Sequence, residues 1–572
     1  MLMKSWRFYT FVFFIGLIFT IIVFRLFTLQ IVKHGFYKIL ASTQHQTFQT
    51  IYPARGEIFM KDERTNNDSR SLLFPVVINK DFWTVYAVPK DIQEKEETVE
   101  KLSPLLGADE NDLRERISKK DDPYEPLKNK ADEETVNKIR ELNLQGIHFE
   151  KESWPYFPAA ELACHVVGFV GFDGDKKVGR YGVEEYYEKD LAGRTGYIET
   201  KKDSLGESVP VADKILSEPE DGIDIILTID PNIQFFVEEK LKQIIENLEA
   251  PSGTIIVMEV KTGAIKAMAN WPEFNPNKYN EVKDANLFSN PAIHDVYEPG
   301  SIFKPITMAG ALDKGVITPT TTYEDRGFTE VSGYIIKNAL ERAEGIQTMT
   351  QVLEKSLNSG AIFAQQKLGK DDFLKYVEKF GFGQKTGIDL SGEEKGNINN
   401  LKKKKDLEYA TASFGQGISV TSIQLIAALS AIANDGILLR PYVVEKIIYK
   451  NGEEKIIQPK EIRRVISSET ASRLTAMMVS VVKNGYSKKA EVPGYLIAGK
   501  TGTSQIPDFE KGGYSEETIH TFGEFFPALN PRFSVLIKVD KPKGISFAAD
   551  SLTPLARQIA EYILNYYEIP PQ

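Results

Sequence analysis

The chain has 572 residues, a hydrophobic content of 42% and a charged content of 26%. This length exceeds what one hydrophobic core supports, and the composition is globular rather than disordered, so we expect two or more folded domains. A formal net charge of −10 gives no support to nucleic-acid binding. A single cysteine, Cys164, excludes an intramolecular disulfide and predicts a buried, unreactive thiol, and six histidines without metal-binding spacing predict no metal and no cofactor.

The first predicted element is a membrane anchor at residues 1–30. Lys4 and Arg7 precede a charge-free apolar run over residues 8–24, and the apolar pattern resumes after Arg25. This run spans about 25 Å as a helix, which is short for a bilayer, but the apolar residues that follow can extend it. No small-residue cleavage site follows, so we expect a retained single-pass helix in the plasma membrane. The leading positive charges place the N-terminus in the cytoplasm and the rest of the chain outside.

Residues 31–225 predict a non-catalytic, β-rich domain with a helical insertion. Short β-branched and aromatic runs alternate with turn residues over about 44–89 and return over 156–230. Between them, over about 90–150, three charged amphipathic segments with acidic starts predict helices. A solvated surface is the simplest expectation for such a charged insertion.

Residues 226–572 predict one α+β domain. A helix is expected over 231–248, and two apolar strands around a Lys-Thr-Gly turn predict a β-hairpin over 252–270. Helical patterns dominate from 301 to about 450. Strands are expected again at 495–499 and 533–540, before a last helix over 554–567. Strands at both ends of a mostly helical middle favour a single domain.

A serine and a lysine three residues apart open the helical region. Ser301 follows a Pro-Gly break and begins a predicted helix that tolerates Pro305 in its first turn. Ser301 alone would be interpreted as a helix cap, but Lys304 lies on the same helix face, about 5–6 Å away at Cβ. A neutral Lys304 can accept the serine proton if burial or a neighbouring cation lowers its pKa, which is about 10.4 in free lysine. Lys500 can be that cation if the fold brings the motifs together.

A second motif, Ser-Leu-Asn at residues 356–358, is a weak signal by itself, because a polar turn after a helix has the same composition. Together with the first motif, it predicts that Ser356 shuttles protons between the lysine and a departing amine. Asn358 would orient Lys304 and hold a substrate amide.

Lys-Thr-Gly begins at residues 261, 385 and 500, so this tripeptide alone carries little information. Only the third copy ends an apolar strand and continues into Thr503. A strand edge can pair with an extended peptide, and Gly502 removes a side chain that would block the approach. Lys500, Thr501 and Thr503 would bind a terminal carboxylate. The backbone N–H groups of Ser301 and Thr503 would form an oxyanion hole.

With these motifs, the chain resembles the class B penicillin-binding proteins, which are monofunctional peptidoglycan D,D-transpeptidases. The resemblance covers nearly everything after the anchor. The matching segments are residues 298–305 (Glu-Pro-Gly-Ser-Ile-Phe-Lys-Pro), 413–417 (Ser-Phe-Gly-Gln-Gly), 433–436 (Ala-Asn-Asp-Gly), 55–58 (Arg-Gly-Glu-Ile), 182–184 (Gly-Val-Glu) and 191–193 (Leu-Ala-Gly).

The resemblance implies an elongated pedestal at 31–225 and a transpeptidase domain with a five-stranded antiparallel sheet, flanking helices and an all-helical lobe. It implies that Ser301 forms an acyl ester with the D-Ala-D-Ala end of a peptidoglycan stem peptide. An amine of a neighbouring stem would resolve the ester. β-Lactams would acylate the same serine, and a SEDS-family glycan polymerase would be a membrane partner.

Several alternatives share the motifs. A secreted β-lactamase would lack the pedestal, and a β-lactam-sensing receptor would carry several membrane spans. A carboxypeptidase differs only in using water as the acceptor, so this activity stays open as a minor one. A catalytically silent scaffold would have no reason to keep all four chemical groups of Ser301, Lys304, Asn358 and Lys500.

Overall fold

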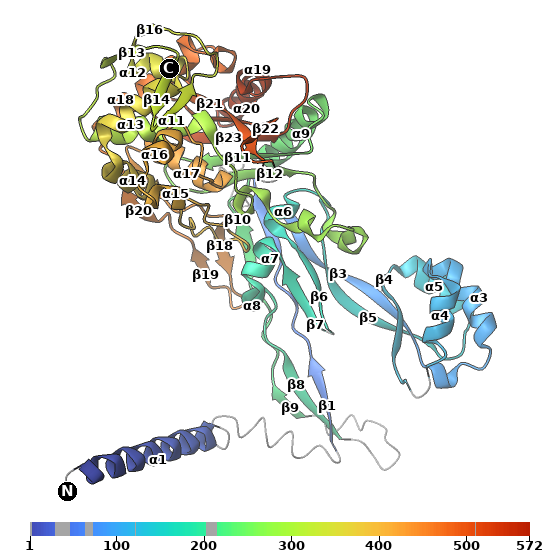
Figure 1. Ribbon diagram of the computed structural model, residues 1–572. Coiled ribbons are helices and arrows are strands. Elements are labelled where there is room, and N and C mark those ends of the chain that lie inside the picture. Colours follow the sequence, from blue (N-terminus) through green and yellow to red (C-terminus); the bar gives the residue numbers. More distant parts are fainter. Residues whose placement is uncertain are drawn as a thin grey trace. The chain divides into compact units, whose positions relative to one another are not determined.

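The computed structural model describes residues 3–28, 46–62, 73–119, 122–174, 176–201, 214–508 and 511–571 (Figure 1). The chain divides into two compact units. The first joins Met1–Ala54 with Gly193–Gly222, and the second joins Arg55–Ala192 with Ile223–Gln572. The domain boundaries expected from the sequence, at residues 30 and 225, stay predictions.

The first unit contains a long helix and a small sheet. Helix α1 (Met3–Phe27) agrees with the predicted N-terminal helix. In the part of the chain that the structure describes, no helix combines the length and the apolarity that crossing a membrane requires, so the predicted transmembrane span is not confirmed. Residues 1–2 and 29–30 of the expected anchor lie outside the described residues. The sheet has the antiparallel order β1 (Gln46–Ile51), β8 (Gly196–Lys201) and β9 (Lys214–Ser217).

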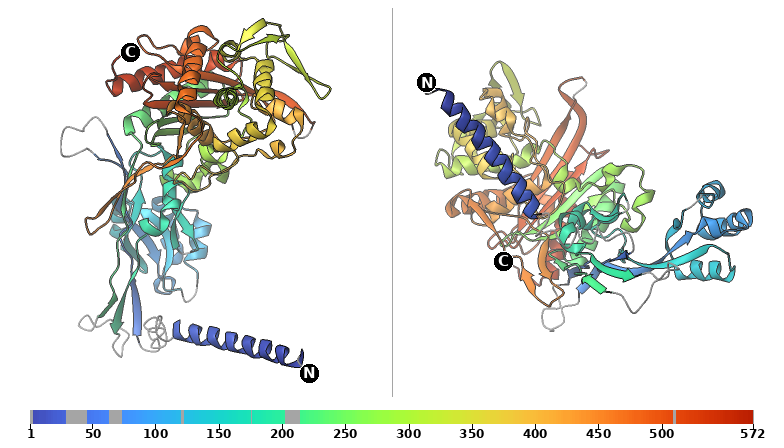
Figure 2. Two further views of the ribbon diagram at one scale, coloured as in Figure 1. Left: turned by 90° about the vertical axis from the view of Figure 1, so that its left-hand side faces the viewer. Right: turned by 90° about the horizontal axis from the view of Figure 1, so that it is seen from below.

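The second unit contains a seven-stranded sheet whose strands come from distant parts of the sequence. Its order is β19-β18-β10-β2-β3-β4, with β5 also paired to β3, and only β10 and β2 run parallel. In Figures 1 and 2 the orange strands β18 and β19 lie beside the green strand β10. The strands are β2 (Ile58–Lys61), β3 (Leu73–Ala87), β4 (Glu125–Ala131), β5 (Ile147–Tyr156), β10 (Asp224–Leu227), β18 (Val444–Ile448) and β19 (Glu454–Ile456).

The predicted helical insertion is present. Its helices are α3 (Lys95–Leu106), α4 (Glu110–Arg116) and α5 (Glu133–Glu141), and the last two are capped by Asp109 and Asp132. Their apolar faces form a small core against β3 and β4. Strand β4 was not predicted, since its sequence is charged and contains a proline.

Short elements follow the insertion, as the Gly-rich sequence predicts. They are α6 (Cys164–Val167), β6 (Phe169–Asp173), β7 (Lys176–Arg180), α7 (Gly182–Tyr186) and α8 (Glu188–Leu191). Cys164 is buried, as expected, and burial raises the pKa of its thiol.

A five-stranded antiparallel sheet forms the centre of the C-terminal region, as the family resemblance implies. Its order is β12-β11-β23-β22-β21. Helices α9 (Pro231–Asn247) and α20 (Thr553–Tyr566) share an apolar core with the sheet, where the rings of Phe236 and Tyr562 stack at 3.8 Å. The strands are β11 (Ser252–Glu259), β12 (Ile265–Trp271), β21 (Ala498–Pro507), β22 (Tyr514–Phe526) and β23 (Phe533–Asp540).

The strand expected at 495–499 begins later than predicted. Gly494 adopts a φ of +84°, and the N–H of Tyr495 donates to the carbonyl of Val492, so a turn occupies these residues. Strand β21 therefore starts at Ala498, and the Lys-Thr-Gly motif lies inside the strand rather than at its end.

The expected helical lobe packs on the five-stranded sheet, and all twelve residues of α17 are buried. Four short strands at 322–348 interrupt it, contrary to the helical prediction, because four-residue strands are too short to show a two-residue period. These strands are β13 (Thr322–Asp325), β14 (Phe328–Val331), β15 (Tyr334–Lys337) and β16 (Gly345–Thr348). The main helices are α11 (Lys304–Asp313), α12 (Met349–Glu354), α13 (Asn358–Leu368), α14 (Lys370–Lys379), α16 (Asp406–Ala412), α17 (Ser422–Ala433) and α18 (Ser468–Asn484).

Candidate active site

The three sequence motifs meet at one hydroxyl. Lys304 Nζ lies 2.5 Å from the carbonyl oxygen of Ser356 and 3.3 Å from its Oγ. Lys500 Nζ donates to the same Oγ at 3.0 Å and to the carbonyl of Thr501 at 3.0 Å. The fold therefore brings together two amines and one serine that are up to 196 positions apart in the chain.

Burial changes the basicity of both amines. Lys304 and Lys500 are 0% and 1% exposed. Burial, and then the charge of Lys500, lower the pKa of Lys304 well below its usual value. Burial also lowers the pKa of Lys500, to about 7. A lysine at this site is therefore able to accept a proton near neutral pH.

Ser301 lies in the 3-10 turn η7 (Gly300–Phe303), directly before α11. Gly300 has a φ of +63° and its N–H donates to the carbonyl of Gly415 at 3.0 Å. A Cβ on Gly415 would lie 2.2 Å from the carbonyl oxygen of Gly300, so only glycine permits this approach. The segment of residues 413–417 therefore packs against η7 and supports the turn that carries Ser301.

Two contacts that the sequence predicts are absent from the described residues. Among the described residues, no hydrogen bond involves the hydroxyl of Ser301, which is half-buried. Asn358 Nδ2 donates to the carbonyl of Lys337 in β15 at 2.9 Å, and no hydrogen bond links Asn358 to Lys304 in the described part of the chain. Asn358 is half-exposed, which is compatible with the predicted contact to a substrate amide.

The Lys-Thr-Gly motif lies on an edge strand. Strand β21 is the last strand of the five-stranded sheet and pairs there with β22, and an edge strand of this kind can pair with an extended peptide. Thr501 and Thr503 are half-buried there, and Thr503 Oγ1 accepts a hydrogen bond from the backbone N–H of Ala548 at 3.1 Å.

The structure shows a packing reason for glycine at position 502. A Cβ on Gly502 would lie 2.8 Å from the carbonyl oxygen of Pro299 and 3.1 Å from Cβ of Ile302. The missing side chain thus lets the turn that carries Ser301 pack against β21, and the predicted role of Gly502 in the approach of a peptide stays a prediction.

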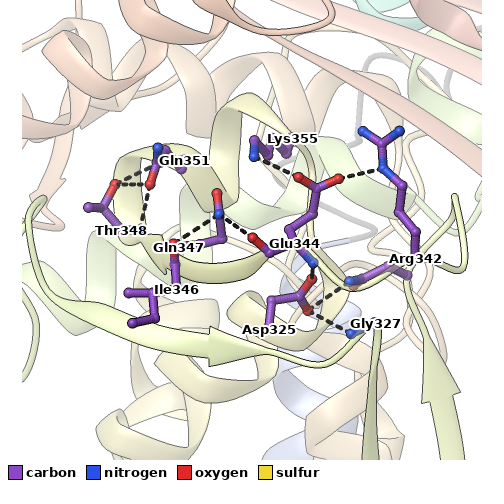
Figure 3. Close-up of polar contacts among 10 residues, drawn as sticks. Asp325, Gly327, Arg342, Glu344, Ile346, Gln347, Thr348, Gln351 and Lys355 are labelled. Atoms are coloured by element: carbon purple, nitrogen blue, oxygen red, sulfur yellow. Dashed lines mark hydrogen bonds and ion pairs between the residues drawn. The ribbon is translucent and has the colours of Figure 1, made fainter.

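The structure adds polar residues that sequence reasoning missed. Asp325, Asn338 and Ser359 are buried and hydrogen-bonded to one another beside the second motif. Glu344 forms ion pairs with Arg342 and Lys355, and Figure 3 shows these contacts together with the bond from the Glu344 N–H to Asp325. Isolated Asp, Asn and Glu residues in short strands give no sequence signal for this arrangement.

Two family models match the chain. The penicillin-binding protein transpeptidase domain matches residues 253–561, and the penicillin-binding protein dimerisation domain matches residues 50–227.

Individual relatives and solved structures agree with these models. The chain is 34% identical to stage V sporulation protein D of Bacillus subtilis, over 91% of this chain and 79% of that protein. It is 29% identical to peptidoglycan D,D-transpeptidase FtsI of Buchnera aphidicola, over 99% of this chain and 96% of that protein. Among structures, penicillin-binding protein 3 of Mycobacterium tuberculosis with aztreonam matches with a TM-score of 0.70 at 25% identity, over 92% and 98%. Penicillin-binding protein 2X of Streptococcus thermophilus shares the fold, with a TM-score of 0.73 at 22% identity, over 91% and 80%.

Proposed function

Because this chain belongs to the class B penicillin-binding proteins, we propose that it is a peptidoglycan D,D-transpeptidase that uses Ser301 as its nucleophile. Its substrate is the D-Ala-D-Ala end of a stem peptide, and β-lactams acylate the same serine. The observation that carries the proposal is the pair of buried lysines that share Ser356, with Lys304 only three residues after Ser301.

In the acylation step, neutral Lys304 takes the proton of Ser301 Oγ as this oxygen attacks the carbonyl of the penultimate D-Ala. The backbone N–H groups of Ser301 and Thr503 stabilise the resulting oxyanion. When the C–N bond breaks, the terminal D-Ala amine receives a proton from Lys304 through the hydroxyl of Ser356. The products are free D-Ala and a serine ester, with Lys304 neutral again.

In the second step, an amine of a neighbouring stem peptide attacks the ester carbonyl. The amine loses a proton to the same lysine and serine relay, and Ser301 Oγ takes a proton as it leaves. Lys500, Thr501 and Thr503 bind the carboxylate of the donor peptide before acylation, and Asn358 binds an amide of the stem. Water in place of the amine would give carboxypeptidase activity.

Fluorescent penicillin tests the nucleophile and its base. We expect a covalent fluorescent band from the wild-type protein, none from Ser301→Ala, and none from a folded Lys304→Ala variant. Circular dichroism should show that both variants keep the wild-type fold. Labelling that persists in Ser301→Ala would remove this serine as the nucleophile, and near-normal labelling of Lys304→Ala would remove the lysine as the base.

We also propose that residues 1–30 anchor the protein in a membrane, and that a SEDS-family polymerase supplies the glycan strands there. The apolar, exposed side chains of α1, including Phe13, Phe19 and Phe24, support the membrane contact. Deletion of residues 1–30 should release a soluble protein that still binds penicillin and no longer co-purifies with the polymerase. Continued membrane residence of this variant would place the anchor elsewhere.

A further inference from the structure

We propose that Asp325 is a positioning residue that holds residues 356–358 against the two lysines. The inference rests on the proposed function, because it assigns to Asp325 a part in the acylation of Ser301. Asp325 is the last residue of β13 and is 1% exposed, so its carboxylate is committed to protein contacts.

The second motif is held at both of its ends. At its C-terminal end, Asn338 Oδ1 accepts hydrogen bonds from the backbone N–H groups of Asn358 at 2.8 Å and Ser359 at 3.1 Å. At its N-terminal end, Lys355 Nζ forms an ion pair with Glu344 Oε2 at 2.7 Å, as Figure 3 shows. The motif is therefore fixed by two side chains that themselves lie outside it.

Asp325 joins these two holding points. Its Oδ1 accepts from Ser359 Oγ at 2.6 Å and from Asn338 Nδ2 at 2.9 Å. Its Oδ2 accepts from the backbone N–H of Glu344 at 2.9 Å. Burial alone would raise the pKa of Asp325, but these hydrogen bonds outweigh it and lower the pKa, so the carboxylate is ionised and strongly bonded.

The residue that these hydrogen bonds position is Ser356, which has a φ of +55°. This left-handed conformation is unfavourable for a residue with a Cβ and persists only where the surroundings impose it. In this conformation the Ser356 carbonyl accepts a hydrogen bond from Lys304 Nζ at 2.5 Å, and the Ser356 hydroxyl oxygen accepts one from Lys500 Nζ at 3.0 Å. Loss of the Asp325 carboxylate would free both flanks and let Ser356 relax away from the amines.

The proposal predicts which kinetic constant changes. Among the described residues, Asp325 makes no hydrogen bond to Ser301, Lys304 or the motif in β21, so the binding of a β-lactam carboxylate should be preserved. The chemical step should slow, because a displacement of about 1 Å at a reacting group can cost about 10²-fold in rate.

The test measures acylation of the full chain by fluorescent penicillin over a range of concentrations. Asp325→Asn should lower the acylation rate at saturation about 10-fold or more and change the dissociation constant of the non-covalent complex by less than about 2-fold. Glu324→Gln is the matched control, since Glu324 is the preceding residue of the same strand, is 64% exposed and forms an ion pair with Arg326. The control should acylate at the wild-type rate.

A reciprocal exchange separates positioning from general damage to the fold. The double variant Asp325→Asn and Asn338→Asp restores a hydrogen bond between the two side chains with donor and acceptor reversed. We expect it to recover part of the saturating rate lost in Asp325→Asn. An unchanged saturating rate in Asp325→Asn, or a loss that appears only in the dissociation constant, would overturn the proposal.

If Asp325→Asn does not fold, as judged by its melting curve, Ser359→Ala decides the matter. This variant removes one hydrogen bond from Asp325 Oδ1 and should fold, with a smaller fall in the saturating rate; a wild-type rate would overturn the proposal. Failure of the proposed function gives a different result, because the wild-type protein itself would then show no label that depends on Ser301.

Discussion

Burial controls the charge of several groups in the transpeptidase domain, with opposite consequences for acids and amines. Lys304 and Lys500 lose affinity for protons on burial, whereas Glu524 gains it. The lysines share a hydrogen-bond acceptor, while both carboxyl oxygens of Glu524 lack a partner among the described residues. Desolvation therefore makes the two amines able to accept a proton, whereas the buried, unpaired carboxyl of Glu524 lowers the stability of the fold.

The lowered pKa of Lys500 predicts how acylation depends on pH. Below about 7 Lys500 is charged and can bind a carboxylate, whereas above this pH the free protein carries it neutral. Burial, and then the charge of Lys500, lower the pKa of Lys304 well below its usual value, which favours its neutral form as a base. The second-order rate constant for acylation by penicillin should therefore fall as the pH rises through about 7, and stopped-flow measurement across pH 5 to 10 checks this.

Lys500→Arg provides the control for this profile. Arginine keeps its charge at all accessible pH values. The second-order rate constant for acylation of this variant should therefore not fall near neutral pH, even if it is lower overall. A wild-type profile that is flat between pH 6 and 9 would show that the charge of Lys500 does not limit carboxylate binding.

Glu524 predicts an unusual dependence of stability on pH. It lies in β22, is 0% exposed, and burial raises the pKa of its carboxyl from 4.5 to about 8. Between these values the unfolded chain is ionised while the folded protein keeps the proton, so stability falls as pH rises from about 4.5 to about 8. Glu524→Met should raise the free energy of unfolding at pH 7 on the order of 3 kcal/mol.

Denaturant titrations at pH 5, 7 and 9 check this prediction. The gain from Glu524→Met should be small at pH 5 and largest at pH 9. Glu524→Gln keeps a buried polar group but cannot titrate, so it should flatten the pH dependence without the full gain. A wild-type stability that matches Glu524→Met at every pH would contradict the buried, unpaired carboxyl.

At the residue scale, the sequence predicts which side chains carry the chemistry but not which residues position them. The residue types and order of Ser301, Lys304, Ser356 and Lys500 predict acyl transfer, and the fold gathers the two amines at Ser356. The contact of Asn358 with the carbonyl of Lys337 was not foreseen, since it depends on the position of a strand 21 residues earlier.

At the element scale, the site depends on the close packing of η7 against β21. The two elements touch where Gly502 faces Pro299 and Ile302. The nucleophile turn and the substrate-binding strand are thus held at a separation that leaves no room for a methyl group.

Gly502→Ala should therefore impair both stability and acylation. The added Cβ meets a backbone oxygen at 2.8 Å, which cannot rotate away, so η7 and β21 must separate. Overpacking of this kind costs about 1–3 kcal/mol, and the acylation rate should fall because Ser301 moves with the turn. Gly171→Ala in β6 is the matched control, since its nearest contact is an ordinary 3.4 Å, and it should behave as wild type in melting and penicillin labelling. If both variants melt and label like the wild-type protein, η7 can move away from β21 without a loss of stability or acylation rate.

Elements with a clear period were predicted well, and those without one were not. The β11–β12 hairpin, β23, α9 and α20 agree with their predicted ranges because each has a strong apolar pattern. The strands β13 to β16 were predicted as part of a helical region. These strands are only four residues long and largely exposed, and tertiary contacts set them: β13 to β15 contact α13 and its N-terminal turn, and β16 contacts α12.

At the scale of the whole molecule, the second compact unit has one continuous core that crosses the expected boundary at residue 225. Ile225 in β10 pairs in parallel with Ile58 in β2, while the other edge of β10 pairs with β18. Val183 and Leu191 belong to the same apolar core as Ile302 and Leu429. The segment before residue 192 therefore contributes to the stability of the transpeptidase fold, although it contains none of the proposed catalytic groups.

This continuity predicts that the transpeptidase region is unstable alone. A fragment of residues 223–572 would expose the β2 edge of β10 and the apolar surface that Ile58, Met60 and Leu191 cover, each of which is 0% exposed in the whole unit. Each such side chain contributes about 1.5–3 kcal/mol when buried, and a typical domain has only about 5–15 kcal/mol in total. Compared with residues 31–572, the fragment should melt at a lower temperature, aggregate through its exposed strand edge and label poorly with fluorescent penicillin. Replacing Ile58 by Ala in the longer chain should give a smaller shift in the same direction. A fragment that melts and labels like the longer chain would mean that the shared sheet and core add nothing to the stability of the catalytic fold.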